Sequence, residues 1–395
     1  MDWISGWKIF VFGIVCFFVF YELSFYFLER VKRKRSFVYF SKNFIEKAFP
    51  FENAWERIVK KQEMLTRVRS VPIIGWTMIP NSNNGVVWTD RNGFRNDNLD
   101  LQGKTVVAVF GGSVALGSMA SNNNKTICGR LQHYLQQEYG ERIVVLNLAQ
   151  SSFTQIQEVS LFSLVLKKLN IKVSVFIEGH NDIGSVFYYK SPGFYGFVGP
   201  VFGGWKKSLS GVIVADTFVK TAVRFLCRFF YIARHTIDFC RSLLYGKSVK
   251  AEHVEKPNLH REIAESFAGI AEIVQDRLHN SGRFALMTLQ PIIYDDDCLS
   301  DAEKKFLQQF SHDRVEFFRE CYKVLKKELY TKRHTYYFTN KTDENVILAD
   351  FTRIRKQAND ILYADDCHFG DYGNDLYAWN IFNVIKHQGW LDQQQ

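Results

Sequence analysis

Short apolar runs alternate with stretches of helical periodicity from residue 104 onward, and this alternation constrains the fold more than any other feature. Apolar runs lie at 105–110, 143–148, 173–177 and 284–289. Helices are predicted at about 127–139, 156–169, 261–278 and 301–329, with a last one beginning near Tyr372. Strands buried on both faces are apolar throughout, and helical crossovers join parallel neighbours. The pattern predicts an α/β domain over about 101–390, with a parallel sheet between helices.

A second apolar run, residues 9–28, precedes this domain and is interrupted only by Glu22. At about 1.5 Å per residue, roughly 20 residues span the core of a bilayer. The run predicts a transmembrane helix within an N-terminal anchor, residues 1–35, that ends in a basic flank. A buried core helix and a cleaved signal peptide are the alternatives, but Arg and Lys follow the run where a signal peptide would have small residues. Residues 36–100 are predicted to be a linker and lead-in segment.

Charge and cysteine content bear on the side of the membrane. The formal net charge is +9, and residues 29–35 carry much of the excess. Because these basic residues follow the predicted helix, the positive-inside rule favours a cytoplasmic domain. The seven cysteines are odd in number and scattered, without a Cys-x-x-Cys pair. This argues against a disulfide framework and a structural zinc site, and is compatible with a reducing compartment.

The alternation is interrupted by an insertion at about 185–258. Residues 215–245 are predicted to be helical, and Lys220, Arg224 and Arg228 form a basic stripe at helical spacing opposite an apolar face. A basic amphipathic helix suits a membrane surface. An ordinary surface helix with its apolar face in the core is the alternative.

Two of the predicted strands are followed by side chains suited to acyl transfer. Ser113 follows the run 105–110 and two glycines, which allow a sharp turn and the close approach of a substrate. Asn181 follows the run 173–177, and its amide is a possible donor to a developing oxyanion. Each has a structural alternative, since Ser113 is also suited to cap a helix and Asn181 to form a turn. In a parallel sheet, however, both positions fall at the carboxyl edge, where ligands bind.

A carboxylate and an imidazole lie three residues apart near the C-terminus, at Asp365 and His368. A serine needs a base within hydrogen-bond reach, and a carboxylate fixes the tautomer of that base. A structural histidine is one alternative, and a metal site with Asp365, Asp366 and His368 is another. The sequence offers no further clustered ligands here, so we expect neither a metal ion nor another cofactor.

The three motifs together resemble the SGNH hydrolase family, also called GDSL, over roughly residues 90–390. The matching segments are Gly111-Gly112-Ser113-Val114, Gly179-His180-Asn181-Asp182 and Asp365 to His368, with Asn92-Gly93-Phe94-Arg95 similar to the lead-in of membrane-associated members. The resemblance implies a flavodoxin-like three-layer α/β/α fold and an esterase or acyl-transfer activity. It also implies Ser113 as nucleophile, His368 as base and Asp365 as the acid that orients it.

The sequence departs from the family pattern at two positions. Gly112 stands where the family has the aspartate of its name, which is not a triad member. Ser152 is the best match to a glycine whose backbone N–H joins the oxyanion hole. The resemblance therefore implies an oxyanion hole made by the N–H groups of Ser113 and Ser152 and by Asn181. The side chain of Ser152 is expected to narrow the acyl pocket.

These features predict a membrane-anchored serine esterase or deacylase that acts on an acylated glycan or lipid. An O-acyltransferase using the same site and a non-catalytic membrane scaffold are the alternatives. Nucleic-acid binding is not expected, because the basic residues cluster beside the predicted membrane helix and no nucleic-acid-binding motif is present. Family members with one membrane helix often act on exported glycans, whereas charge and cysteines favour the cytoplasm, so the membrane side stays open. The oligomeric state is not predicted.

Overall fold

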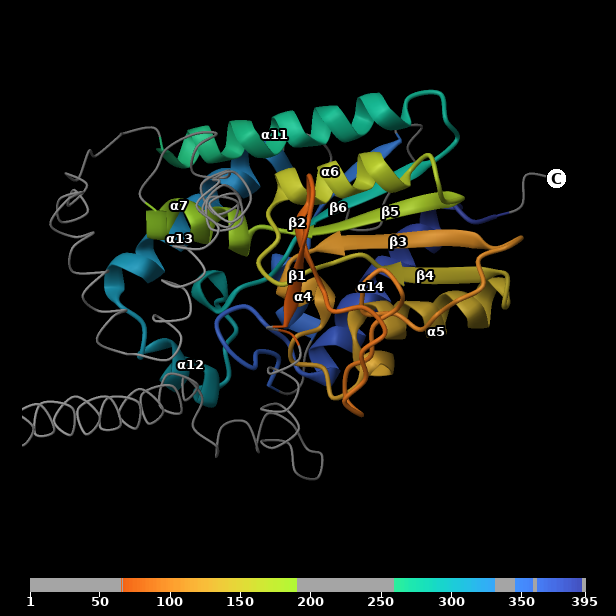
Figure 1. Ribbon diagram of the computed structural model, residues 1–395. Helices are drawn as coiled ribbons and strands as arrows, with labels where there is room; N and C mark the ends of the chain where they lie inside the picture. The colour runs from red at the N-terminus through yellow and green to blue at the C-terminus, as the bar shows by residue number, and fades with distance from the viewer. Residues whose placement is uncertain (1–64, 66, 190–258, 331–344, 358–360, 393–395) are drawn as a thin grey trace, which may run out of the picture. The chain divides into compact units, whose positions relative to one another are not determined.

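The computed structural model describes residues 65, 67–189, 259–330, 345–357 and 361–392 (Figure 1). The predicted transmembrane segment 9–28 and the predicted amphipathic helix 215–245 lie outside these residues. Within the described part of the chain, no helix combines the length and the apolar character needed to cross a membrane.

A five-stranded sheet forms the centre of the domain. Its strands are β3 (Thr105–Gly111), β4 (Ile143–Asn147), β5 (Ile171–Glu178), β6 (Phe284–Leu289) and β7 (Val346–Asp350). They are arranged in the order β4-β3-β5-β6-β7, and every neighbouring pair is parallel. The predicted α/β class with a parallel sheet is confirmed, and this strand order is the one found in flavodoxin-like proteins.

Helices cover both faces of the sheet, which explains why the strands are largely apolar. In Figure 1, α6 (Gln155–Val165) and α11 (Leu259–Leu278) lie on one face, and α5 (Ile127–Tyr139) and α14 (Asp371–Gln388) on the other. Caps set several helix starts. Thr126 caps α5 by accepting from Gly129 N, and Thr154 forms a capping box with Gln157 at α6.

Four parts of this domain differ from the prediction. The helix predicted at 301–329 is two helices, α12 (Asp301–Leu307) and α13 (His312–Leu325), followed by a π-helical turn, η3 (Lys326–Tyr330). At the break, Ser311 has an extended backbone and precedes the first residue of α13, without a side-chain capping bond. The helix predicted at 156–169 ends at Val165. Strand β7 and helix α7 (His180–Tyr189) were not predicted.

The lead-in segment contacts the domain through a hairpin and a polar loop. Strands β1 (Val68–Val71) and β2 (Gly75–Met78) pair antiparallel. The indole N–H of Trp76 donates to the carbonyl of Ser151 at 3.1 Å, and the side chain of Gln150 accepts from Met78 N at 3.1 Å. The remaining short elements are η1 (Asn123–Lys125), η2 (Ile293–Asp295), η4 (Thr352–Gln357) and α4 (Ser113–Leu116).

Candidate active site

The candidate site lies where the strand order reverses. β3 and β5 are neighbours, while the chain runs from β3 to β4 on one side and from β5 to β6 on the other. The connections that follow such a pair diverge and leave a crevice at the carboxyl ends of the strands. Ser113 follows β3, and His180 and Asn181 follow β5. Segments that are far apart in the sequence therefore meet at this edge.

A tight turn presents the Ser113 side chain. Gly111 has φ +154°, and a Cβ there would lie 2.6 Å from the Cβ of Ala115 and 2.9 Å from the carbonyl oxygen of Ile177. Gly112 is the N-cap of α4, so Ser113 is the first residue of that helix and not its cap. Every residue from Val106 to Ser121 is buried except Ser113. The turn thus leaves one serine accessible on an otherwise buried segment.

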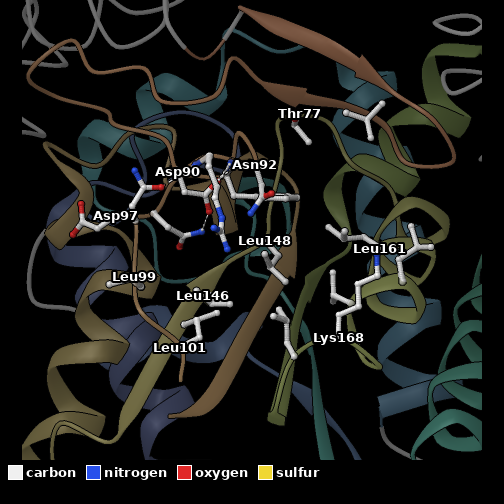
Figure 2. Close-up of a pocket in the computed structure, with 18 of the residues that line it drawn as sticks. Thr77, Asp90, Asn92, Asp97, Leu99, Leu101, Leu146, Leu148, Leu161 and Lys168 are labelled. Carbon is white, nitrogen blue, oxygen red and sulfur yellow. Dashed lines mark hydrogen bonds between the residues drawn. The ribbon is translucent and has the colours of Figure 1, made fainter. Parts of the chain in front are cut away.

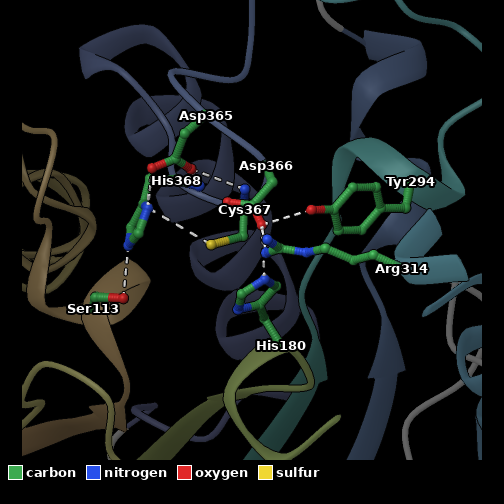
Figure 3. Close-up of polar contacts among 8 residues, drawn as sticks. All are labelled: Ser113, His180, Tyr294, Arg314, Asp365, Asp366, Cys367 and His368. Carbon is green, nitrogen blue, oxygen red and sulfur yellow. Dashed lines mark hydrogen bonds and ion pairs between the residues drawn. The ribbon is translucent and has the colours of Figure 1, made fainter. Parts of the chain in front are cut away.

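The structure brings Ser113, His368 and Asp365 into one hydrogen-bonded line (Figure 3). Nε2 of His368 lies 2.6 Å from the Oγ of Ser113, and Nδ1 lies 2.5 Å from Oδ2 of Asp365. The other carboxylate oxygen, Oδ1, accepts from the backbone N–H groups of Cys367 at 2.9 Å and His368 at 2.7 Å. These bonds fix the carboxylate, and the carboxylate fixes the imidazole. A histidine held in this way is suited to act as a base toward Ser113.

The three expected oxyanion donors also lie at this edge of the sheet. Among the described residues, the backbone N–H groups of Ser113 and Ser152 donate to no other protein atom. Ser152 is exposed and has φ +62°, a left-handed conformation that glycine adopts more readily. This conformation gives a physical reason for a glycine at the equivalent family position. The Asn181 amide donates from Nδ2 to the carbonyl of Phe153 at 2.8 Å, which ties α7 to the loop that contains Ser152.

A second polar cluster, not predicted from the sequence, lies beside the first and is centred on Asp366 (Figure 3). Its Oδ2 accepts from the hydroxyl of Tyr294 at 2.8 Å, lies 3.2 Å from Nε2 of His180 and pairs with Nη2 of Arg314. The guanidinium of Arg314 lies 5.1–5.8 Å from the ring centres of Tyr294, Phe310 and Phe318. Burial raises the pKa of Asp366, but His180, Arg314 and Tyr294 together lower that pKa well below its usual range. Asp366 therefore stays ionised.

Three buried carboxyl groups, Glu158, Glu178 and Asp182, lie near the oxyanion donors Ser152 and Asn181. Gln155, at the start of α6, links α6 to the end of β5 and the start of α7, because its backbone N–H donates to Oδ1 of Asp182 at 3.0 Å and its side chain donates to Glu178. Burial raises the pKa of Asp182 to about 7. Burial and the neighbouring acids also raise the pKa values of Glu158 and Glu178 well above the usual range. These groups therefore hold protons at pH values where surface carboxyls are ionised.

Arg95 supports the nucleophile turn from below. Its side chain is only 3% exposed. It donates from Nη1 to the carbonyls of Leu116 at 3.1 Å and Gly117 at 2.5 Å, and from Nε to Oδ1 of Asn123 at 2.8 Å. Burial lowers the pKa of Arg95 to about 9. The guanidinium thus binds the C-terminal carbonyls of α4, whose first residue is Ser113, and a cation at that end of a helix is favourable.

Two sets of side chains in this region could offer three ligand atoms to a metal ion. They are His180, Asp366 and Cys367, and Asp365, Cys367 and His368. In both sets the carboxylate and the histidine already contact each other. A metal ion would have to displace Arg314 from the first set or break the line to Ser113 in the second. The existing contacts, to Arg314 in the first set and to Ser113 in the second, therefore fit these residues better than metal binding.

Figure 2 shows residues that line a cavity of about 1040 Å³. The cavity is bordered by Asp90 and Asn92 of the lead-in, by Leu146 in β4, by Leu148 just after β4, and by Leu161 of α6. A second cavity of about 710 Å³ is lined in part by Tyr294, which also contacts Asp366. Ser113, His368 and Asp365 line neither cavity. Cavity size therefore does not identify the reactive centre, whereas the hydrogen-bond geometry does.

No family model and no curated protein matches this sequence. Similar solved structures include the acetyl xylan esterase AlAXEase, with 13% identity over 71% of this chain and 99% of that one and a TM-score of 0.37. A putative lipolytic protein of the G-D-S-L family from Desulfitobacterium hafniense has 12% identity over 71% and 99%, with a TM-score of 0.34. An acetylxylan esterase from Geobacillus stearothermophilus has 10% identity over 74% and 98%, with a TM-score of 0.33. These neighbours are esterases and a protein described as lipolytic.

Proposed function

We propose that this protein is a serine esterase of the SGNH/GDSL type that hydrolyses an O-acyl ester. One observation carries the proposal. The Oγ of Ser113 lies 2.6 Å from a histidine nitrogen whose partner nitrogen lies 2.5 Å from a carboxylate. A serine hydroxyl is a poor nucleophile until an adjacent base removes its proton, and this arrangement supplies that base.

In the proposed reaction, the Oγ of Ser113 attacks the ester carbonyl while Nε2 of His368 takes the hydroxyl proton. Asp365 stabilises the imidazolium that forms. The carbonyl oxygen becomes an oxyanion and accepts hydrogen bonds from the N–H groups of Ser113 and Ser152 and from the amide of Asn181. The intermediate then collapses, and the departing alkoxide takes the proton from His368. The acyl group remains as an ester on Ser113.

Water completes the cycle. His368 deprotonates a water molecule that attacks the acyl-enzyme, and a second oxyanion forms in the same hole. Its collapse breaks the bond to Ser113, returns a proton to Oγ and releases the carboxylic acid. If a sugar hydroxyl replaced water in this step, the product would be a transferred ester. The products therefore distinguish hydrolysis from acyl transfer.

The predicted substrate is an acylated glycan or lipid, and the N-terminal apolar run 9–28 supports a membrane-anchored form. The proposal includes this substrate class and the membrane anchor, but not the side of the membrane on which the domain lies. Neighbours in the structural comparison include an esterase active on acetylated mannans, with 10% identity over 73% of this chain and 51% of that one and a TM-score of 0.34. Acetylated polysaccharides are therefore reasonable first substrates to assay.

The test compares the full-length protein in detergent with Ser113→Ala and Ser160→Ala, using p-nitrophenyl acetate and an acetylated glycan. Ser160 is a matched control, because its hydroxyl only donates to the carbonyl of Ile156 within α6, at 2.6 Å. We expect Ser113→Ala to abolish release of the acid, while Ser160→Ala retains the parent rate. Equal activity of Ser113→Ala and the parent would reject the assignment. A folded parent inactive toward both substrates would favour a non-catalytic scaffold.

A further inference from the structure

Gly112 lies directly before the proposed nucleophile. Its surroundings, and not its backbone conformation, require a residue without a side chain. Its backbone has φ −81° and ψ −152°, which other residues also adopt. The preceding Gly111, by contrast, has φ +154°. The conformation of residue 112 therefore does not require glycine, so the reason for the glycine must lie in the space around it.

That space is filled by the side chain of Asn181. A Cβ on residue 112 would lie 1.9 Å from Nδ2 of Asn181, 3.1 Å from its Cγ and 3.4 Å from the carbonyl oxygen of Phe153. The first distance is far below van der Waals contact. In this structure any side chain at residue 112 would therefore displace the Asn181 amide from its present position, so the aspartate that the family carries here is not compatible with the arrangement of this chain.

The position of this amide nitrogen suits a donor of two hydrogen bonds. An amide nitrogen carries two hydrogens. One of them is used in the bond from Nδ2 of Asn181 to the carbonyl of Phe153, at 2.8 Å. The same nitrogen lies against the backbone of the residue that precedes Ser113. Its second hydrogen is thus available next to the nucleophile, where the oxyanion forms.

From this close approach we infer that Gly112 is a positioning residue whose missing side chain admits Asn181 to the oxyanion hole. The inference rests on the proposed esterase function and deepens it. A side chain at residue 112 would push the amide away from Phe153 and from the reacting carbonyl together. Asn181 is a short side chain at the start of α7 and can rotate away, so the fold should survive. Loss of turnover without loss of folding is the expected signature.

The first experiment measures kcat and KM for ester hydrolysis by the full-length protein and by Gly112→Ala. We expect kcat to fall by roughly 10²–10³-fold, the effect of removing one oxyanion donor, with KM little changed. The melting temperature should stay close to that of the parent. Gly269→Ala is the matched control, because a Cβ there meets nothing within 4 Å. Full activity of Gly112→Ala would overturn the inference.

A double-mutant cycle tests whether Gly112 acts through Asn181. Asn181→Ala alone should lower kcat by a similar factor, and Gly112→Ala should cause little further loss in that background. Independent losses that multiply would overturn the inference, because Gly112 would then act elsewhere. Ser113→Ala separates the two proposals. If Ser113→Ala is inactive but Gly112→Ala is not impaired, only the positioning role fails. If Ser113→Ala retains activity, or the parent has none, the esterase proposal fails and this inference with it.

Discussion

Two histidine–aspartate pairs lie beside each other in this protein, and they differ in what surrounds them (Figure 3). Asp365 contacts His368 at 2.5 Å, and Asp366, the next residue, contacts His180 at 3.2 Å. The second nitrogen of His368 faces the hydroxyl of Ser113. Asp366 instead shares its Oδ2 between His180, Tyr294 and Arg314.

The comparison shows that a neighbouring carboxylate does not by itself make a histidine a catalytic base. In the first pair, the carboxylate is held by two backbone N–H groups, so its effect is directed through His368 to Ser113. In the second pair, the charge of Asp366 is matched by the guanidinium of Arg314. We therefore assign the first pair to proton transfer and the second to holding the 365–368 loop in place.

The largest expected effect separates the two histidines. His368→Ala should lower kcat for ester hydrolysis by roughly 10⁴-fold or more, as loss of the base does in other serine hydrolases. His180→Ala should retain most of the parent kcat, because the ring of His180 contacts Asp366 and not the hydroxyl of Ser113. Initial rates on p-nitrophenyl acetate, normalised to the folded fraction, measure both. Comparable losses in the two variants would show that both pairs take part in the chemistry.

The two aspartates should separate activity from stability. Asp365→Asn should lower kcat by about 10⁴-fold with little change in unfolding free energy, because the wrong histidine tautomer is favoured. Asp366→Asn should retain much of the activity but lose roughly 2–4 kcal/mol of stability, since it leaves the guanidinium of Arg314 without its charge partner. Urea unfolding and steady-state rates on the same samples test this. The reverse pattern would exchange the roles assigned to the pairs.

Asp366 and Asp182 should respond to pH in opposite directions. The pKa of Asp366 is lowered in the folded protein, so its contribution to stability is present above about pH 4 and is lost as the pH falls further. The pKa of Asp182 is raised to about 7, so its contribution is present in acid and is lost as the pH rises through 7. Melting temperatures at pH 3–9 should therefore show Asp366→Asn converging with the parent in acid. Asp182→Asn should gain on the parent between about pH 4 and 7 and keep that gain above neutrality, and parallel curves for all three proteins would contradict this.

The smallest effect on kcat is expected at Ser152, because its backbone N–H, and not its side chain, is the proposed oxyanion donor. Ser152→Gly should leave kcat for a small acetyl ester nearly unchanged, because the N–H donor is retained. It should also relieve the left-handed conformation at φ +62°, a gain of at most about 1 kcal/mol. A large loss of kcat would show that the hydroxyl of Ser152 contributes directly. Longer acyl esters should be accepted better if this side chain narrows the pocket.

Periodicity predicted most of the fold, and it failed where the pattern is short or depends on distant contacts. The buried strands β3 and β6 were predicted almost to the residue, because continuous apolar runs leave little choice. Strand β7 was missed because its apolar part, Val346 to Ala349, is only four residues long, and so short a run does not by itself distinguish a strand from part of a helix. The break at Ser311 was missed because charged residues on both sides favour one continuous helix.

Local motifs predicted the residues that line up with Ser113, because each lies in a short segment with distinctive neighbours. They did not predict Tyr294 or Arg314, which reach Asp366 from η2 and α13 and have no local motif. Arg95 was noticed only as part of a lead-in motif, and nothing in the sequence placed it beneath α4. Residues that act by supporting others are visible only once the segments are assembled.

The most direct test of the central assignment is fluorophosphonate labelling of the full-length protein, His368→Ala and His180→Ala, with the modified residue mapped by mass spectrometry. The account predicts one modified serine, Ser113, in the parent and in His180→Ala, and no modification in His368→Ala. Labelling of a different serine, or loss of labelling in His180→Ala with labelling retained in His368→Ala, would contradict it.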